Sequence, residues 1–188
     1  MQEQVMLIPD IKYVQQQDGI LCSMSACLAM LLPYYGIDWP KHDIADLFSR
    51  TFLSDSFRDW QIKSVTMDRY DDSTMLSCAV YLINTMIPDI SAGIITTDID
   101  KVALSYIKRK IPVIVSGRFP IPSGETPNTV LVRGYVDHFL VVHDPKGNAS
   151  TGYRDRYGEN MMYSVNDMAQ WVHQNNAAHI LRIIPGYS

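Results

Sequence analysis

A cysteine stands at the predicted start of the most apolar helix of this chain. The helix is expected over residues 22–34, with apolar side chains nearly all round: Ala26, Leu28, Ala29, Met30, Leu31 and Leu32. A helix of this kind has to be buried at the centre of a fold. Pro33 near its end and Gly36 just after it predict where it stops. The N-terminal end of a helix favours negative charge, which makes Cys22 a natural position for a nucleophilic thiol.

A glutamine lies six residues before this cysteine. The side-chain amide of Gln16 can turn back and donate a hydrogen bond to an oxyanion formed at Cys22, beside the backbone N–H of Cys22 itself. The alternative is that Cys22 is simply a small buried residue at a helix start, because free cysteines are among the most buried residue types.

The second half of the chain adds further motifs in a definite order. A strand at residues 112–117 is followed by a Pro/Gly/Ser-rich loop at residues 120–127, a strand that reaches Gly134-Tyr135, and a strand that ends in Asp144-Pro145 with Gly147 after it. Together with Gln16, Cys22 and Tyr34-Tyr35-Gly36, these motifs resemble the papain-like cysteine peptidases that process bacteriocin leaders, the double-glycine peptidase type, and their bacterial and phage relatives. The resemblance covers roughly residues 11–175.

The resemblance implies a role for four positions. Cys22 matches the nucleophile, Gln16 the oxyanion donor and Asp144 the acid that orients an imidazole. The family's catalytic histidine lies six residues before the Gly of the Gly-Tyr turn, and that position is Asn128 here. An asparagine amide cannot take a proton from a thiol or give one to a leaving amine near neutral pH. The site therefore lacks its proton carrier.

His143 is the only realistic substitute among the five histidines. It directly precedes Asp144 on a predicted strand, where successive side chains point to opposite faces, so a one-residue shift or bulge is needed to present it. His138 belongs to a tight turn at the far end of the strand from Asn128. The others read as ordinary surface or packing residues: His42, His173 and His179.

Length and composition indicate one globular domain spanning residues 1–188. Hydrophobic residues make up 47% and charged residues 19% of the chain, which argues against disorder. The formal net charge is −4 and the longest basic run is residues 108–110, so we expect no nucleic-acid partner.

The remaining signals concern location and cofactors. The first residues lack the basic and apolar regions of a secretory signal, and no apolar segment reaches the length of about 18 residues that a membrane span requires. We therefore expect a soluble protein made in the cytoplasm. Cys22, Cys27 and Cys78 show no zinc-ligand spacing, so we expect no metal, no cofactor and no disulfide framework, with Cys27 buried.

The secondary-structure pattern predicts an α+β fold of the papain-like kind. Helices are expected at residues 22–34, 41–50, 73–86 and 98–109, a short amphipathic segment at 165–172, and strands at 112–117, 129–136, 138–144, 160–163 and 178–184. Short turns make the sheet mostly antiparallel, and the helical half that carries Cys22 packs on it. A peptide is expected to lie in the cleft between the halves.

Two functions follow from these observations. In the first, the chain is a cysteine peptidase or amidase acting on peptides or cell-wall-type amides. Cys22 attacks a carbonyl, and Gln16 with backbone N–H groups holds the oxyanion. Asp144 orients a base, which must be His143 or a water-relayed group because Asn128 occupies the histidine position. In the second, it is a non-catalytic module of the same fold that binds a peptide, a glycan or another subunit, for example in a phage particle. The retained Cys22 favours the first function and the missing histidine favours the second. The sequence does not decide the oligomeric state.

Overall fold

The computed structural model describes residues 5–17, 22–39, 41–64, 72–88, 90–174 and 177–185. The helices are α1 (Ser23–Tyr34), α2 (Lys41–Phe52), α3 (Asp55–Ser64), α4 (Asp72–Met86), α5 (Ile99–Ile107), α6 (Val165–Val172) and the 3₁₀ turn η1 (Ala149–Thr151). The strands are β1 (Val5–Leu7), β2 (Ile90–Thr97), β3 (Val113–Ile121), β4 (Gly124–Val136), β5 (Phe139–His143), β6 (Met161–Ser164), β7 (His173–Gln174) and β8 (Ala177–Pro185). None of the described helices is both long and apolar enough to cross a membrane.

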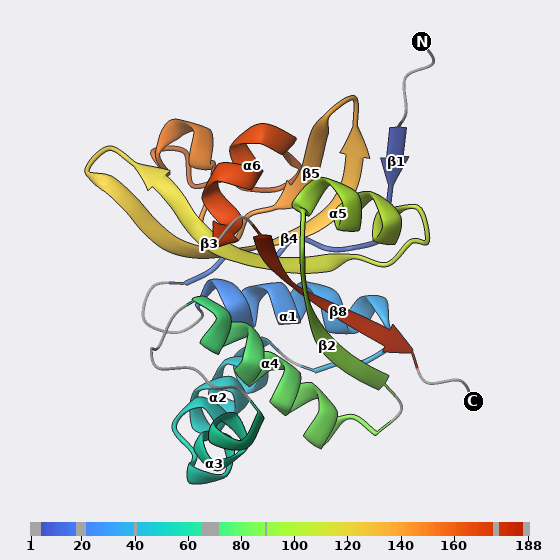
Figure 1. Ribbon diagram of the computed structural model, residues 1–188, viewed down its shortest axis with the longest axis vertical. Coiled ribbons are helices and arrows are strands. Elements are labelled where there is room, and N and C mark those ends of the chain that lie inside the picture. The colour runs from blue at the N-terminus through green and yellow to red at the C-terminus, as the bar shows by residue number, and fades with distance from the viewer. Residues whose placement is uncertain are drawn as a thin grey trace.

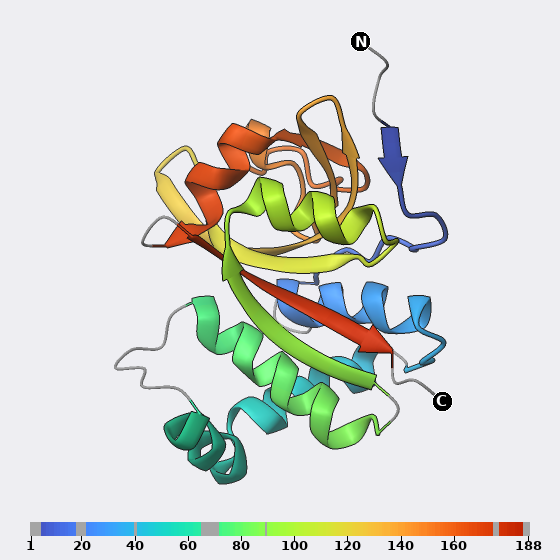
Figure 2. The same ribbon diagram turned by 45° about the vertical axis from the view of Figure 1, so that its right-hand side comes forward.

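One antiparallel sheet separates two groups of helices. Its strand order is β2-β8-β3-β4-β5-β6, with β1 added to β4 and β7 added to β8. Helices α1 to α4 lie on one side of this sheet, and α5, α6 and η1 lie on the other (Figures 1 and 2). The fold is therefore α+β, as predicted.

Helix α1 is enclosed between the sheet and the other helices of its side. Nine consecutive residues of α1, from Met24 to Leu32, are buried, and Cys22 is the residue that caps its start. Pro33 lies in its last turn and the positive φ of Gly36 follows. The prediction of a central buried helix that begins at Cys22 is confirmed.

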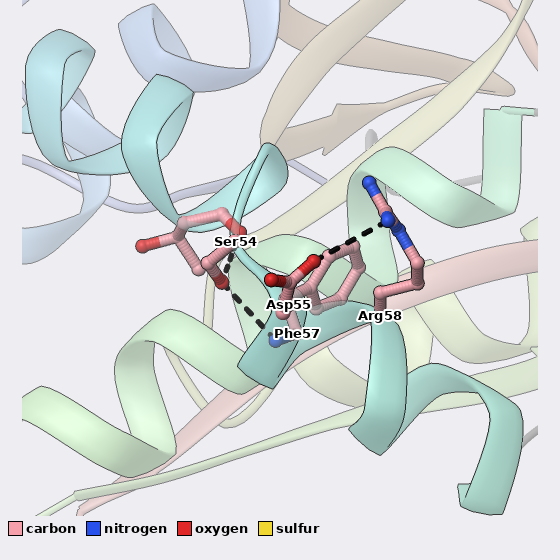
Figure 3. A network of polar contacts seen from close by, with 5 residues as sticks. Ser54, Asp55, Phe57 and Arg58 are labelled. Atoms are coloured by element: carbon pink, nitrogen blue, oxygen red, sulfur yellow. Dashed lines mark hydrogen bonds and ion pairs between the residues drawn. The ribbon is translucent and has the colours of Figure 1, made fainter.

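Helix α3 is the helix that the sequence pattern did not reveal. Its start is capped by Ser54, whose hydroxyl donates to the carbonyl of Thr51 at the end of α2 (2.8 Å) and accepts the N–H of Phe57 (3.1 Å). Asp55 pairs with Arg58 one turn later (Figure 3). The other predicted helices are confirmed, with ends that differ by one or two residues: 41–50, 73–86 and 98–109. The amphipathic segment at residues 165–172 is helix α6.

The prediction of a loop at residues 120–127 is wrong. These residues extend β3 and β4 into a hairpin that turns at Pro122 and Ser123, with Pro120 paired to Glu125 and Arg118 to Pro127. Strand β8 pairs only with residues 113–115 of β3, and β5 pairs with β4 only from Leu131 onward. The two prolines therefore lie where their missing N–H groups remove no bond to a third strand.

Candidate functional site

The thiol of Cys22 is exposed at the start of α1. The Cys22 carbonyl accepts the N–H of Ala26 (3.0 Å) and the hydroxyl of Ser25 (3.1 Å). The same hydroxyl oxygen lies 3.2 Å from the Cys22 sulfur. Ser25 is buried, so it holds both the backbone and the sulfur of Cys22 from inside the helix.

Asp144 follows the last residue of β5 and is fully buried. Its Oδ1 accepts the amide of Asn128 (2.9 Å) and the N–H of Lys146 (3.0 Å). Its Oδ2 accepts the hydroxyls of Tyr163 (2.9 Å) and Tyr153 (3.4 Å). Burial raises the pKa of Asp144 to about 6, even though these four hydrogen bonds lower it. The carboxyl group is thus oriented from four directions.

Asn128 lies in β4 and contacts Asp144 through its donor end. Its Nδ2 donates to Asp144 Oδ1 and, at 2.8 Å, to the hydroxyl of Tyr153. Its Oδ1 is buried and has no hydrogen-bond partner among the described residues. The amide nitrogen therefore occupies the place of the imidazole N–H that faces the acid, but the amide oxygen, although it accepts hydrogen bonds, is too weakly basic to take a proton near neutral pH.

Cys27 connects the start of α1 to this pair. It lies five residues after Cys22, and its sulfur donates to the carbonyl of Thr129, the neighbour of Asn128, at 3.4 Å. Burial raises the pKa of Cys27 well above its ordinary value, and the charges of Asp144 and Cys22 raise it further. The first two turns of α1 therefore lie against the beginning of β4, on the same stretch that carries Asn128.

Gln16 is held beside the Asp144 loop by its backbone. Its N–H donates to the carbonyl of Pro145 (2.9 Å), and the hydroxyl of Tyr13 donates to the carbonyl of Asp144 (3.0 Å). We call residues 8–16 the N-terminal strap, because this segment runs along residues 143–145 from Ile11 onward. The strap brings Gln16, which is half-buried, to the same end of β5 as Asp144.

The His143 ring is hydrogen-bonded to the strap and not to Asp144 or the residues around it. Its Nδ1 accepts the N–H of Asn160 (3.2 Å), so the proton is on Nε2, which donates to the carbonyl of Ile11 (3.0 Å). The guanidinium of Arg133 lies 3.1 Å from Nε2 and also donates to the carbonyl of Ile8. Burial lowers the pKa of His143 and so favours the neutral ring. The sequence left His143 open as a substitute base, but both ring nitrogens face backbone groups of other segments.

Comparison with known proteins identifies the family of this chain. A model of the Peptidase C39-like family matches residues 8–179. The chain belongs to this family. No curated protein matches the chain. Among solved structures, the fold is similar to that of the peptidase domain of Streptococcus ComA, a bifunctional ABC transporter involved in quorum sensing. The TM-score is 0.54 and the sequence identity is 17%, over 95% of this chain and 100% of that one. A putative C39-like peptidase from Bacillus anthracis gives a TM-score of 0.53 and 14% identity over 98% of this chain and 100% of that one. The predicted papain-like fold is thereby confirmed.

The candidate site also contains residues to which the sequence assigned no role. The hydroxyls of Tyr153 and Tyr163 donate hydrogen bonds to Asp144, and the Ser25 hydroxyl contacts the sulfur of Cys22. Tyr153 has a positive φ of 62° directly after Gly152 at 63°, a backbone shape that only the folded turn reveals.

Proposed function

We propose that this C39-like domain binds peptides at the start of α1 without hydrolysing them. The observation that carries the proposal is the 2.9 Å hydrogen bond from the Asn128 amide to Asp144, at the position where the family resemblance expects an imidazole. Acyl transfer to a thiol requires a group that accepts the thiol proton and later protonates the leaving amine. The amide of Asn128 does neither.

The surroundings of His143 support the same function. Its ring donates to the strap and accepts from the chain before β6, so it cannot exchange a proton with Cys22 while these bonds persist. His138 lies in the exposed turn between β4 and β5. The side chains of His42, His173 and His179 lie outside the described residues.

The roles that we propose for the retained residues concern binding. Cys22 is exposed at a helix start, where backbone N–H groups are available to a peptide carbonyl. Gln16, placed by the strap next to Pro145, is the proposed second donor to that carbonyl. Asn128 is the proposed acceptor on the opposite side, because its Oδ1 has no hydrogen-bond partner among the described residues while Asp144 holds its amide nitrogen.

The decisive experiment restores the imidazole. We expect Asn128→His to create hydrolysis of a fluorogenic peptide library, because general acid–base catalysis is worth about 100- to 10,000-fold. The wild-type chain is expected to show no turnover of the same library. A peptide that the variant cleaves is then labelled and titrated against the wild type, where fluorescence anisotropy is expected to show binding while mass spectrometry finds the peptide intact.

Two controls accompany this variant. Asn166→His introduces an imidazole at an exposed position of α6 and is expected to gain no activity. Adding Cys22→Ala to Asn128→His is expected to abolish the new hydrolysis. Turnover by the wild-type chain that depends on Cys22 would reject the proposal in favour of a working peptidase, and failure of the wild type to bind a peptide cleaved by the variant would reject the binding function.

A further inference from the structure

A concave site lies on the other side of the sheet from α1. A cavity of about 920 Å³ is bounded by the tip of the β3–β4 hairpin, by η1 and the turn after it, and by α6. Figure 1 shows α6 and the hairpin on the side of the sheet opposite α1. The volume is near the upper end of the range for small-molecule sites, about 300–1,000 Å³.

The walls of this cavity are held in place by packing and hydrogen bonds. The Trp171 ring lies 5.3 Å from that of Phe119 and 5.2 Å from that of Tyr163. The Tyr163 hydroxyl accepts the N–H of Ala149, and the side chain of Asn148 accepts the N–H of Ser150. The concave shape is therefore preformed, as in most small-molecule sites.

Charged groups of both signs surround the cavity. Arg154 and Asp155 come from the turn after η1, and Asp167 comes from α6. Asp155 accepts the N–H of Tyr157 through Oδ1, and Asp167 accepts the Ser164 hydroxyl through Oδ2. In the described part of the chain, the second oxygen of each carboxylate makes no hydrogen bond. The cavity thus offers hydrogen-bond donors and acceptors together. Because its charged groups are of both signs, it does not favour a cation or an anion.

The hairpin wall does not suit an extended peptide. A peptide that adds to a sheet edge needs N–H groups and carbonyls from that edge in alternation. Pro120 and Pro122 line the cavity at the hairpin tip, and neither has a backbone N–H. A ligand in this cavity has to be recognised by side chains instead.

We propose that this cavity binds an uncharged oligosaccharide. A sugar ring has one apolar C–H face, which suits Trp171 and the prolines, and an edge of hydroxyl groups, which suits a guanidinium beside carboxylates. The volume accommodates more than one ring. This site goes beyond the peptide-binding function and uses neither Cys22 nor Asn128.

The test is isothermal titration calorimetry of the full chain with three uncharged tetrasaccharides: cellotetraose, maltotetraose and tetra-N-acetylchitotetraose. We expect at least one of them to bind with a Kd of about 1 mM or tighter. Arg154→Ala removes a rim donor and is expected to raise that Kd about tenfold, an effect of about 1.4 kcal/mol. Ser150→Trp places a large ring in the cavity and is expected to abolish binding.

Matched variants separate this proposal from the peptide-binding function. Arg58→Ala changes an exposed arginine of α3, on the other side of the sheet, and is expected to leave the Kd unchanged. Cys22→Ala is also expected to leave saccharide binding unchanged. The proposal is overturned if none of the three sugars binds, if Arg154→Ala and Ser150→Trp bind as well as the wild type, or if a peptide held at Cys22 displaces the sugar.

Discussion

Replacement of His143 by alanine tests whether the strap depends on this ring. The change leaves the carbonyl of Ile11, a residue that is 4% exposed, without its donor and opens a cavity at a fully buried position. An unsatisfied buried polar group costs about 1–3 kcal/mol, and large-to-small core changes cost about 2–5 kcal/mol. We therefore expect His143→Ala to lower the free energy of unfolding by about 3–8 kcal/mol.

Urea denaturation followed by circular dichroism measures this loss. His138→Asn is the matched control, because His138 is exposed in a turn at a φ of 73° where asparagine is tolerated, and a change within about 0.5 kcal/mol is expected. Native-state hydrogen exchange adds a local measurement. The backbone N–H of Gln16, which donates to the carbonyl of Pro145, is expected to exchange faster in His143→Ala. The backbone N–H groups of α4 are expected to exchange only through global unfolding.

The stability lost in His143→Ala is expected to depend on pH with a definite sign. Burial lowers the pKa of His143 in the folded state below the unfolded value of about 6.5. The unfolded chain then binds more protons below pH 6.5, so acid destabilises the wild type more than the alanine variant. Arg133 faces the ring and disfavours its protonation, while Glu159 and the Ile11 carbonyl oppose this. A loss under about 1 kcal/mol, or a stability difference that widens on acidification, would refute the reasoning.

Three further predictions concern other parts of the molecule. Iodoacetamide is expected to label Cys22 in the native protein and to reach Cys27 and Cys78 only after unfolding. Burial shields these two thiols and raises their pKa, for Cys78 to about 12. Peptide mapping by mass spectrometry measures the labelling of each cysteine, and equal labelling of all three would contradict the prediction. Burial raises the pKa of Asp144 to about 6, against about 3.9 in the unfolded chain. The wild type is therefore expected to gain stability relative to Asp144→Asn as the pH falls from about 6 to about 4. Urea unfolding at several pH values checks the sign, and a difference in stability that does not change with pH argues against the prediction. Ser54→Ala removes the cap of α3 and is expected to cost about 1 kcal/mol in thermal unfolding, and an unchanged melting temperature counts against the capping role.

The helices could be predicted where their apolar pattern is local. The continuous apolar surface of α1 and the amphipathic patterns of α2, α4 and α5 belong to contiguous residues, and each was recognised from spacing alone. Strand β2 was missed because apolar residues alternate with small or polar ones only over residues 90–94, and Ile95 directly after Ile94 breaks the pattern. Its pairing partner, β8, lies far along the chain, and the paired residues Ala92 and Ile183 are 91 positions apart.

The hairpin at residues 120–127 shows a different limit. Prolines and glycines predict a loop because they disfavour a sheet interior. Whether a strand segment lies in the interior or beyond its neighbours depends on the lengths and registers of the other strands. Here β8 ends its pairing at Val115, so Pro120 could remain in β3.

The sequence by itself determined the chemical content of the candidate site. A side chain carries its functional groups wherever it is placed, so Asn128 cannot become a base, and the order of motifs placed it opposite Asp144 correctly. Only the tertiary structure decided what surrounds these groups. Burial against Tyr153 and Tyr163 raises the pKa of Asp144, and the strap occupies the His143 ring, because desolvation and hydrogen bonding depend on segments that are distant in the chain and meet only on folding.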